Sequence, residues 1–63
     1  MRLNGESVPD EVLSVTALLV KYDIRQEGIA VAIDGEIVPR SQWNVTDSSF
    51  GCSIEIVTAA AGG

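Results

Sequence analysis

Ten residues in the middle of the chain, Ile29-Ala30-Val31-Ala32-Ile33-Asp34-Gly35-Glu36-Ile37-Val38, decide its fold. The first five alternate large and small apolar side chains, so a strand would place the isoleucines and the valine on one face and the alanines on the other. Asp34-Gly35 predicts a two-residue turn, because type I′ hairpins need positive φ at both turn positions. Residues 36–38 are then the return strand, and Pro39 ends it by removing a backbone donor. This stretch predicts a β-hairpin.

A second hairpin is predicted at the start of the sequence. Met1 and Leu3 belong to a very short strand that runs into Asn4-Gly5, the strongest two-residue hairpin signal. Residues 6–8 form the return strand, and Pro9 ends its pairing.

One helix is predicted between the two hairpins. Its apolar face is formed by residues at i, i+3, i+4 and i+7: Val15, Leu18, Leu19 and Tyr22. Ser14 precedes this face and can cap the first turn, whereas Asp10 is a rival cap that would start the helix four residues earlier. We prefer Ser14, because Val12 and Leu13 can then finish the second strand or its approach to the core.

The second half of the chain adds a short helical turn and a final strand. Residues 41–43 predict the turn, with Ser41 as its cap, and Trp43 is expected to pack on the core. Residues 54–58 alternate as a strand, with Ile54 and Ile56 facing the core. Asn-Gly and Asp-Gly are interpreted as structural turns and no more.

These elements predict an α+β domain over residues 1–58, with a mixed sheet of four to five strands and one main helix. Residues 59–63, Ala-Ala-Ala-Gly-Gly, have no periodicity and are expected to form a flexible tail. A single helix covers only one face of a sheet well. The other face is therefore either solvated or used for a partner.

The composition excludes several classes of protein. The chain has 63 residues and a net charge of −5, which argues against nucleic-acid binding. It has no histidine and one cysteine, Cys52, so neither a Ser-His-Asp triad nor a Cys/His zinc cluster can form within it. Cys52 is more often a small buried hydrophobe than a nucleophile in this context. With no apolar run of membrane-spanning length and no signal pattern, we expect a soluble cytoplasmic protein that is not an enzyme by itself.

The sequence offers two candidate sites. Glycine lacks a Cβ, so the terminal Gly62-Gly63 can enter a narrow site of another protein, with the Gly63 α-carboxylate as the reacting group. The alternative is a frayed end. Arg40 lies in a Pro-Arg-Ser-Gln-Trp corner and is either a partner-recognition residue or a solvated cation. The nine carboxylates are scattered, which favours a solvated surface that steers the domain towards a basic partner.

Over nearly its whole length the chain resembles the ThiS family, the ubiquitin-like sulfur carriers of thiamin biosynthesis. The resemblance rests on Asn4-Gly5-Glu6, on Val15-Thr16-Ala17-Leu18-Leu19, on Val31 to Trp43, and on Ile54-Glu55-Ile56-Val57 leading to Gly62-Gly63. The segment Gly35-x-x-Val38-Pro39-Arg40-x-x-Trp43 is its most specific part.

This resemblance implies a β-grasp fold and a chemistry for the last residue. A ThiF-type enzyme would use ATP and Mg²⁺ to adenylate Gly63. A cysteine desulfurase or a rhodanese-like protein would supply sulfur, and the resulting thiocarboxylate would serve a ThiG-type thiazole synthase. Gly62 and Ala61 would be recognised with the tail. Val57, which faces away from Ile54 and Ile56, and Arg40 are candidates for docking. No metal or cofactor is expected on the chain itself.

Three alternatives remain open on sequence alone. A similar diglycine end occurs in carriers for other sulfur pathways, such as the molybdopterin synthase small subunit, and in protein modifiers. A plain interaction domain without C-terminal chemistry is a further possibility.

Overall fold

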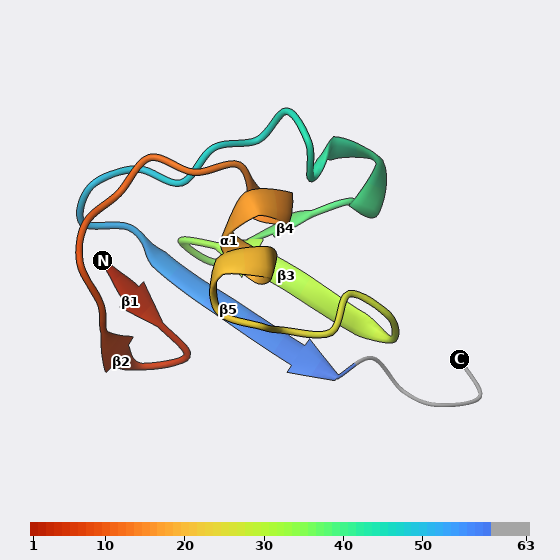
Figure 1. Cartoon of the computed structure of the whole chain (residues 1–63), viewed down its shortest axis with the longest axis horizontal. Helices are drawn as coiled ribbons and strands as arrows, with labels where there is room; N and C mark the ends of the chain where they lie inside the picture. The colour runs from red at the N-terminus through yellow and green to blue at the C-terminus, as the bar shows by residue number, and fades with distance from the viewer. Residues whose placement is uncertain (59–63) are drawn as a thin grey trace.

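A mixed sheet forms the body of the structure, a computed structural model that describes residues 1–58 (Figure 1). Within these residues the strands are β1 (Arg2–Leu3), β2 (Glu6–Ser7), β3 (Ile29–Ile33), β4 (Glu36–Val38) and β5 (Ser53–Thr58). Their order in the sheet is β2-β1-β5-β3-β4. β1 pairs with β5 in parallel, and the other neighbours are antiparallel. The expected α+β architecture with a mixed sheet is confirmed.

Both predicted hairpins close through the expected turn chemistry. Asn4 and Gly5 have φ values of 52° and 84°, and Asp34 and Gly35 have values of 51° and 83°. These are the positive values that a type I′ turn requires. β2 ends at Ser7, one residue earlier than predicted, although the Val8 N–H still donates to the Met1 carbonyl at 2.9 Å.

The interpretation of the two turns as structural is confirmed, and their side chains add contacts that the sequence did not reveal. The Asn4 side-chain oxygen accepts the Ile56 N–H at 2.7 Å, and Asp34 Oδ1 accepts the Ser53 N–H at 2.8 Å. β5 lies between β1 and β3, so the turn that follows each of those strands reaches it. Each turn side chain thus supplies an acceptor to β5 as well as tolerating positive φ.

The helix α1 (Val15–Lys21) begins where Ser14 predicts it. Ser14 has an extended backbone, and its hydroxyl accepts the Ala17 N–H at 3.1 Å, as an N-cap does. Of the two outcomes expected for Val12 and Leu13, completion of the second strand is wrong, and an approach to the core is confirmed for Leu13. Leu13 packs against the core, and its carbonyl accepts the Ser48 N–H, whereas the Val12 side chain is 59% exposed.

A 3₁₀ helix, η1 (Arg40–Gln42), forms the corner after β4. The prediction that Ser41 caps it is wrong, because η1 begins one residue earlier and has no side-chain cap. Pro39 precedes it with φ −59°, and the Pro39 carbonyl accepts the Gln42 N–H at 2.8 Å. Proline thus supplies the geometry for which we had expected a serine cap.

The core lies between α1 and the sheet face that it covers (Figure 1). Its largest fully buried side chains come from α1, β3 and β5: Leu18, Leu19, Val31 and Ile54. Trp43 is buried as expected and donates its indole N–H to the Val38 carbonyl at 3.0 Å. Ile56 packs on the core from β5, which begins at Ser53 rather than Ile54.

Candidate functional site

The sheet face opposite α1 carries an apolar surface. The register pairs Ala30 with Val57, Ala32 with Ile37, and Ala32 with Glu55. Paired residues point to the same side of a sheet, and the flanking residues Val31, Val38 and Ile54 are buried beneath α1. The apolar members of this outer set, Ala30, Ala32, Ile37 and Val57, form what we call the open face.

The open face is hollowed at its centre. A shallow hollow of about 150 Å³ is lined by residues of β3, β4 and β5: Ala30, Val31, Ala32, Ile37, Glu55 and Val57. It exists because β3 presents alanines between the larger side chains of Ile37 and Val57. Those two side chains, which line the hollow, are 70% and 58% exposed. The hollow is large enough for a benzene-sized apolar group.

Glu55 is the charged residue that lines the hollow. It is exposed and lies across from Ala32 on β3. Within residues 1–58 its carboxylate forms no ion pair. Arg2 belongs to the same side of the sheet, because it pairs with Ser53, two residues before Glu55 on β5.

The predicted reactive end lies outside the described residues. Ala61, Gly62 and Gly63 follow β5, whose last residue is Thr58. Figure 1 shows that β5 crosses the molecule and ends on the side away from the N-terminus. Val57 therefore connects the open face with the end of the chain from which residues 59–63 continue.

Arg40 makes intramolecular contacts and does not lie at the hollow. Its guanidinium stacks over the Trp43 ring, 4.6 Å from the centroid, and donates to the Gln26 carbonyl. These contacts tie η1 to the loop before β3. They give Arg40 a structural role that the sequence did not reveal, and its predicted part in docking stays a prediction.

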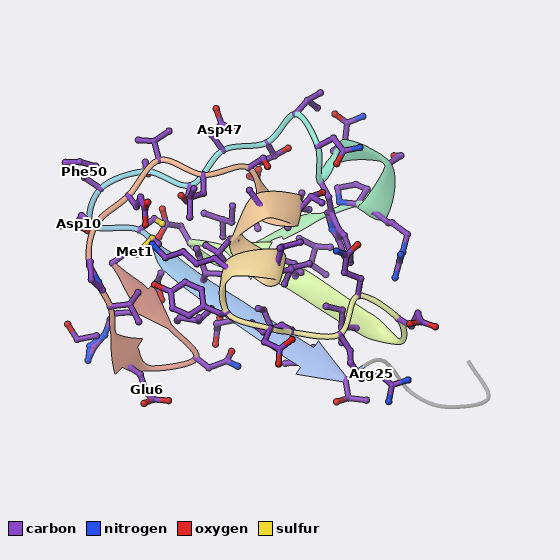
Figure 2. The ribbon with its side chains drawn as sticks, viewed as in Figure 1. Met1, Glu6, Asp10, Arg25, Asp47 and Phe50 are labelled. Carbon is purple, nitrogen blue, oxygen red and sulfur yellow. The ribbon has the colours of Figure 1, made fainter. Side chains whose placement is uncertain are left out.

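Two groups that contact Met1 bear on reactivity. Cys52 is 2% exposed, with its Sγ 3.9 Å from the Met1 sulfur, which confirms it as a small buried hydrophobe. Asp10 accepts hydrogen bonds from the Met1 ammonium and from the Gly51 N–H (Figure 2). These bonds hold the pKa of Asp10 below its usual value. Asp10 remains an exposed carboxylate, as expected, and in addition it holds Met1 and Gly51 together.

The described residues hold no assembled catalytic centre. No group of three or more potential metal ligands comes together in residues 1–58, and no helix there is long and apolar enough to cross a membrane. Every buried side-chain nitrogen or oxygen in that range has a hydrogen-bond partner. The apolar, hollowed open face next to the end of β5 is suited to binding another protein.

The sequence identified Val57 as a docking candidate but did not identify the residues that surround it at the hollow. The alternation in 29–33 had placed Ala30 and Ala32 together, but Ile37 and Glu55 join them only through the strand order β5-β3-β4. Neighbouring residues of a strand face opposite sides of the sheet, so a buried Val38 implies that Ile37 faces away from the core. This local signal could have identified Ile37 as a member of the open face.

The fold and the open face define a class, the small β-grasp proteins related to ubiquitin. The ThiS family model matches residues 1–63, and the chain belongs to that family, the sulfur carriers of thiamin biosynthesis. A solved structure, the thiamine biosynthesis protein (ThiS) from Geobacter metallireducens, is similar with a TM-score of 0.85 and 32% identity, covering 98% of this chain and 96% of that one. A comparison with curated proteins gives no match.

Proposed function

We propose that Gly63 is the sulfur attachment point of this carrier. The observation that carries the proposal is the family match over residues 1–63, which includes the Gly62-Gly63 end. The β-grasp body would serve as the part that partners recognise. The chain itself would catalyse nothing, because its reactive group is a main-chain carboxylate.

The reaction begins with activation. A ThiF-type adenylating enzyme binds ATP and Mg²⁺, and a Gly63 carboxylate oxygen attacks the α-phosphorus of ATP. Pyrophosphate leaves and an acyl-adenylate forms. Glycines at 62 and 63 allow the main chain to enter the narrow enzyme site, because no Cβ obstructs its approach.

Sulfur transfer follows, because AMP is a good leaving group and makes the acyl carbon of Gly63 open to attack. The terminal sulfur of a protein persulfide, on a cysteine desulfurase or a rhodanese-like donor, attacks the acyl carbon and AMP leaves. A second thiol then cleaves the sulfur–sulfur bond, which gives a disulfide and the Gly63 thiocarboxylate. A ThiG-type thiazole synthase takes this sulfur for the thiazole ring. We place these steps in the cytoplasm.

Ala61, Gly62 and Gly63 act as the recognised tail, and Val57 contributes to docking through the open face. The family match supports the thiazole pathway over a molybdopterin-type carrier or a protein modifier. Covalent conjugates to lysines of other proteins, without a thiocarboxylate, would favour the modifier.

The test is adenylation and the mass of the product. With the cognate adenylating enzyme, the full chain should support ATP–pyrophosphate exchange. With a sulfur donor added, the intact mass should show one terminal oxygen replaced by sulfur. Deletion of Gly63 should abolish both. Normal exchange by the chain that lacks Gly63 would refute the proposal.

Deletion of Ala59 is the matched control. It shortens the tail by the same one residue, about 3.5 Å of extended chain, and keeps Gly62-Gly63. We expect this variant to retain exchange, so that loss in the first variant reports on the terminal glycine and not on length.

A further inference from the structure

We propose that Glu55 determines which protein can dock on the open face. It selects a partner that seats an apolar side chain in the hollow and places a lysine or arginine beside the Glu55 carboxylate. The inference rests on the proposed function in one respect: the adenylating enzyme is the binding partner used to test it.

The first argument is the position of the charge. Glu55 lines the hollow together with apolar groups of Ala30, Ala32, Ile37 and Val57. Any surface that covers these groups also removes water from around the carboxylate. A charge that loses water at an interface needs a partner charge or hydrogen-bond donors.

The second argument is that the chain does not supply that partner. Within residues 1–58, the ion pairs join Met1 to Asp10 and Lys21 to Glu11, and neither involves Glu55. Arg2, the cation on the same side of the sheet, forms no ion pair with it. We therefore infer that the compensating cation comes from the docking protein.

The third argument concerns a second copy of the chain. Two open faces packed together would bring two Glu55 carboxylates into one apolar contact, between bodies that each carry a net charge of −5. Like charges brought together at an interface are strongly unfavourable. Glu55 thus opposes self-association through exposed aliphatic groups that would otherwise promote it.

Binding to the adenylating enzyme tests the partner chemistry. We expect the wild-type dissociation constant to rise between 50 and 300 mM NaCl, because salt screens the contact. Glu55→Gln should weaken binding about tenfold at 50 mM and reduce the salt dependence, and Glu55→Lys should weaken it further.

Glu6→Lys is the matched control, because it makes the same change of charge on β2, two strands away from β5 (Figure 2). It should change the dissociation constant by less than about threefold. Glu55→Lys that binds as wild type, or Glu6→Lys that loses as much as Glu55→Lys, would overturn the proposal. A chain ending at Thr58 that binds the adenylating enzyme more tightly than the full chain would also overturn the proposal. That result would mean that residues 59–63, and not a partner, occupy the hollow in the free protein.

Sedimentation equilibrium tests the second copy without any enzyme. The wild type should be monomeric at about 100 µM, a concentration at which only contacts with dissociation constants weaker than this stay mostly unformed. Glu55→Leu should self-associate at the same concentration. A wild-type dimer that Ile37→Asp abolishes would overturn the proposal. Failure of the proposed function is seen separately, as wild-type chain that supports no ATP–pyrophosphate exchange.

Discussion

At the scale of single residues, the Asp10 carboxylate connects its own loop with the N-terminus and with the segment before β5. Asp10 accepts hydrogen bonds from the Met1 ammonium and from the Gly51 N–H, the latter at 2.9 Å. Met1 is itself buried, and Cys52 lies against its side chain. Asp10 therefore anchors the first strand beside the loop that leads into β5.

This contact predicts a dependence of stability on pH. The Met1 and Gly51 hydrogen bonds lower the pKa of Asp10 from its unfolded value of 3.8. A carboxyl with a lowered folded pKa stabilises the protein fully above its unfolded pKa, and this contribution is lost as pH falls through the folded pKa. We expect the free energy of unfolding to fall below about pH 4.

Urea denaturation from pH 7 to pH 3 measures the effect. Asp10→Asn should be less stable than wild type at pH 7 and should flatten the acid limb of the profile. Glu6→Gln is the control, because Glu6 forms no ion pair within residues 1–58. An unchanged acid limb in Asp10→Asn would contradict the assignment.

At the scale of elements, the corner between β4 and η1 depends on Trp43. The indole N–H donates to the Val38 carbonyl at the end of β4, and Arg40 of η1 stacks over the ring. The side chain is 3% exposed, so it also fills the core beneath α1. One residue thus connects a strand, a 3₁₀ helix and the core.

Substitutions at Trp43 separate these contributions. Trp43→Phe keeps an aromatic ring and leaves the Val38 carbonyl without its donor, which should cost about 1–3 kcal/mol. Trp43→Ala should cost about 3–5 kcal/mol, comparable to the whole stability of a domain this small, and should unfold it. Chemical denaturation measures both.

Val45→Ala is the exposed control, since Val45 is 72% exposed and should change stability by no more than about 0.5 kcal/mol. A Trp43→Phe variant as stable as wild type would show that the hydrogen bond to Val38 contributes nothing.

At the scale of the whole molecule, the folded body lies within residues 1–58, and the proposed sulfur attachment point, Gly63, follows it in the sequence. The sheet and the core described above are complete within residues 1–58. A chain ending at Thr58 should therefore melt within about 3 °C of the full chain, because about 1 kcal/mol shifts the melting temperature by 4–8 °C in a domain of this size.

The same truncated chain should support no ATP–pyrophosphate exchange. Calorimetry and the exchange assay together check that folding and chemistry reside in different segments. A fall of 10 °C or more, roughly 2 kcal/mol, would show that residues 59–63 contribute to the fold.

Local chemistry in the sequence determined the elements of this protein. Asn4-Gly5 and Asp34-Gly35 specify type I′ turns because both positions need positive φ, and Ser14 specifies the start of α1 because its hydroxyl caps a free N–H. The β-grasp fold and the ThiS family also followed from the sequence, since its motifs extend over nearly the whole chain.

Only the tertiary structure decided how these elements combine into a surface. Ile37 and Glu55 are 18 positions apart in the sequence and meet at one hollow because β3 lies between β4 and β5. The roles of Arg40 and the two turn side chains likewise depend on partners 14 to 52 residues away, and Asp10 joins Met1 and Gly51, which are 9 and 41 residues away. Periodicity reports which side of a strand a residue occupies, whereas strand order and register decide which other residues share that side.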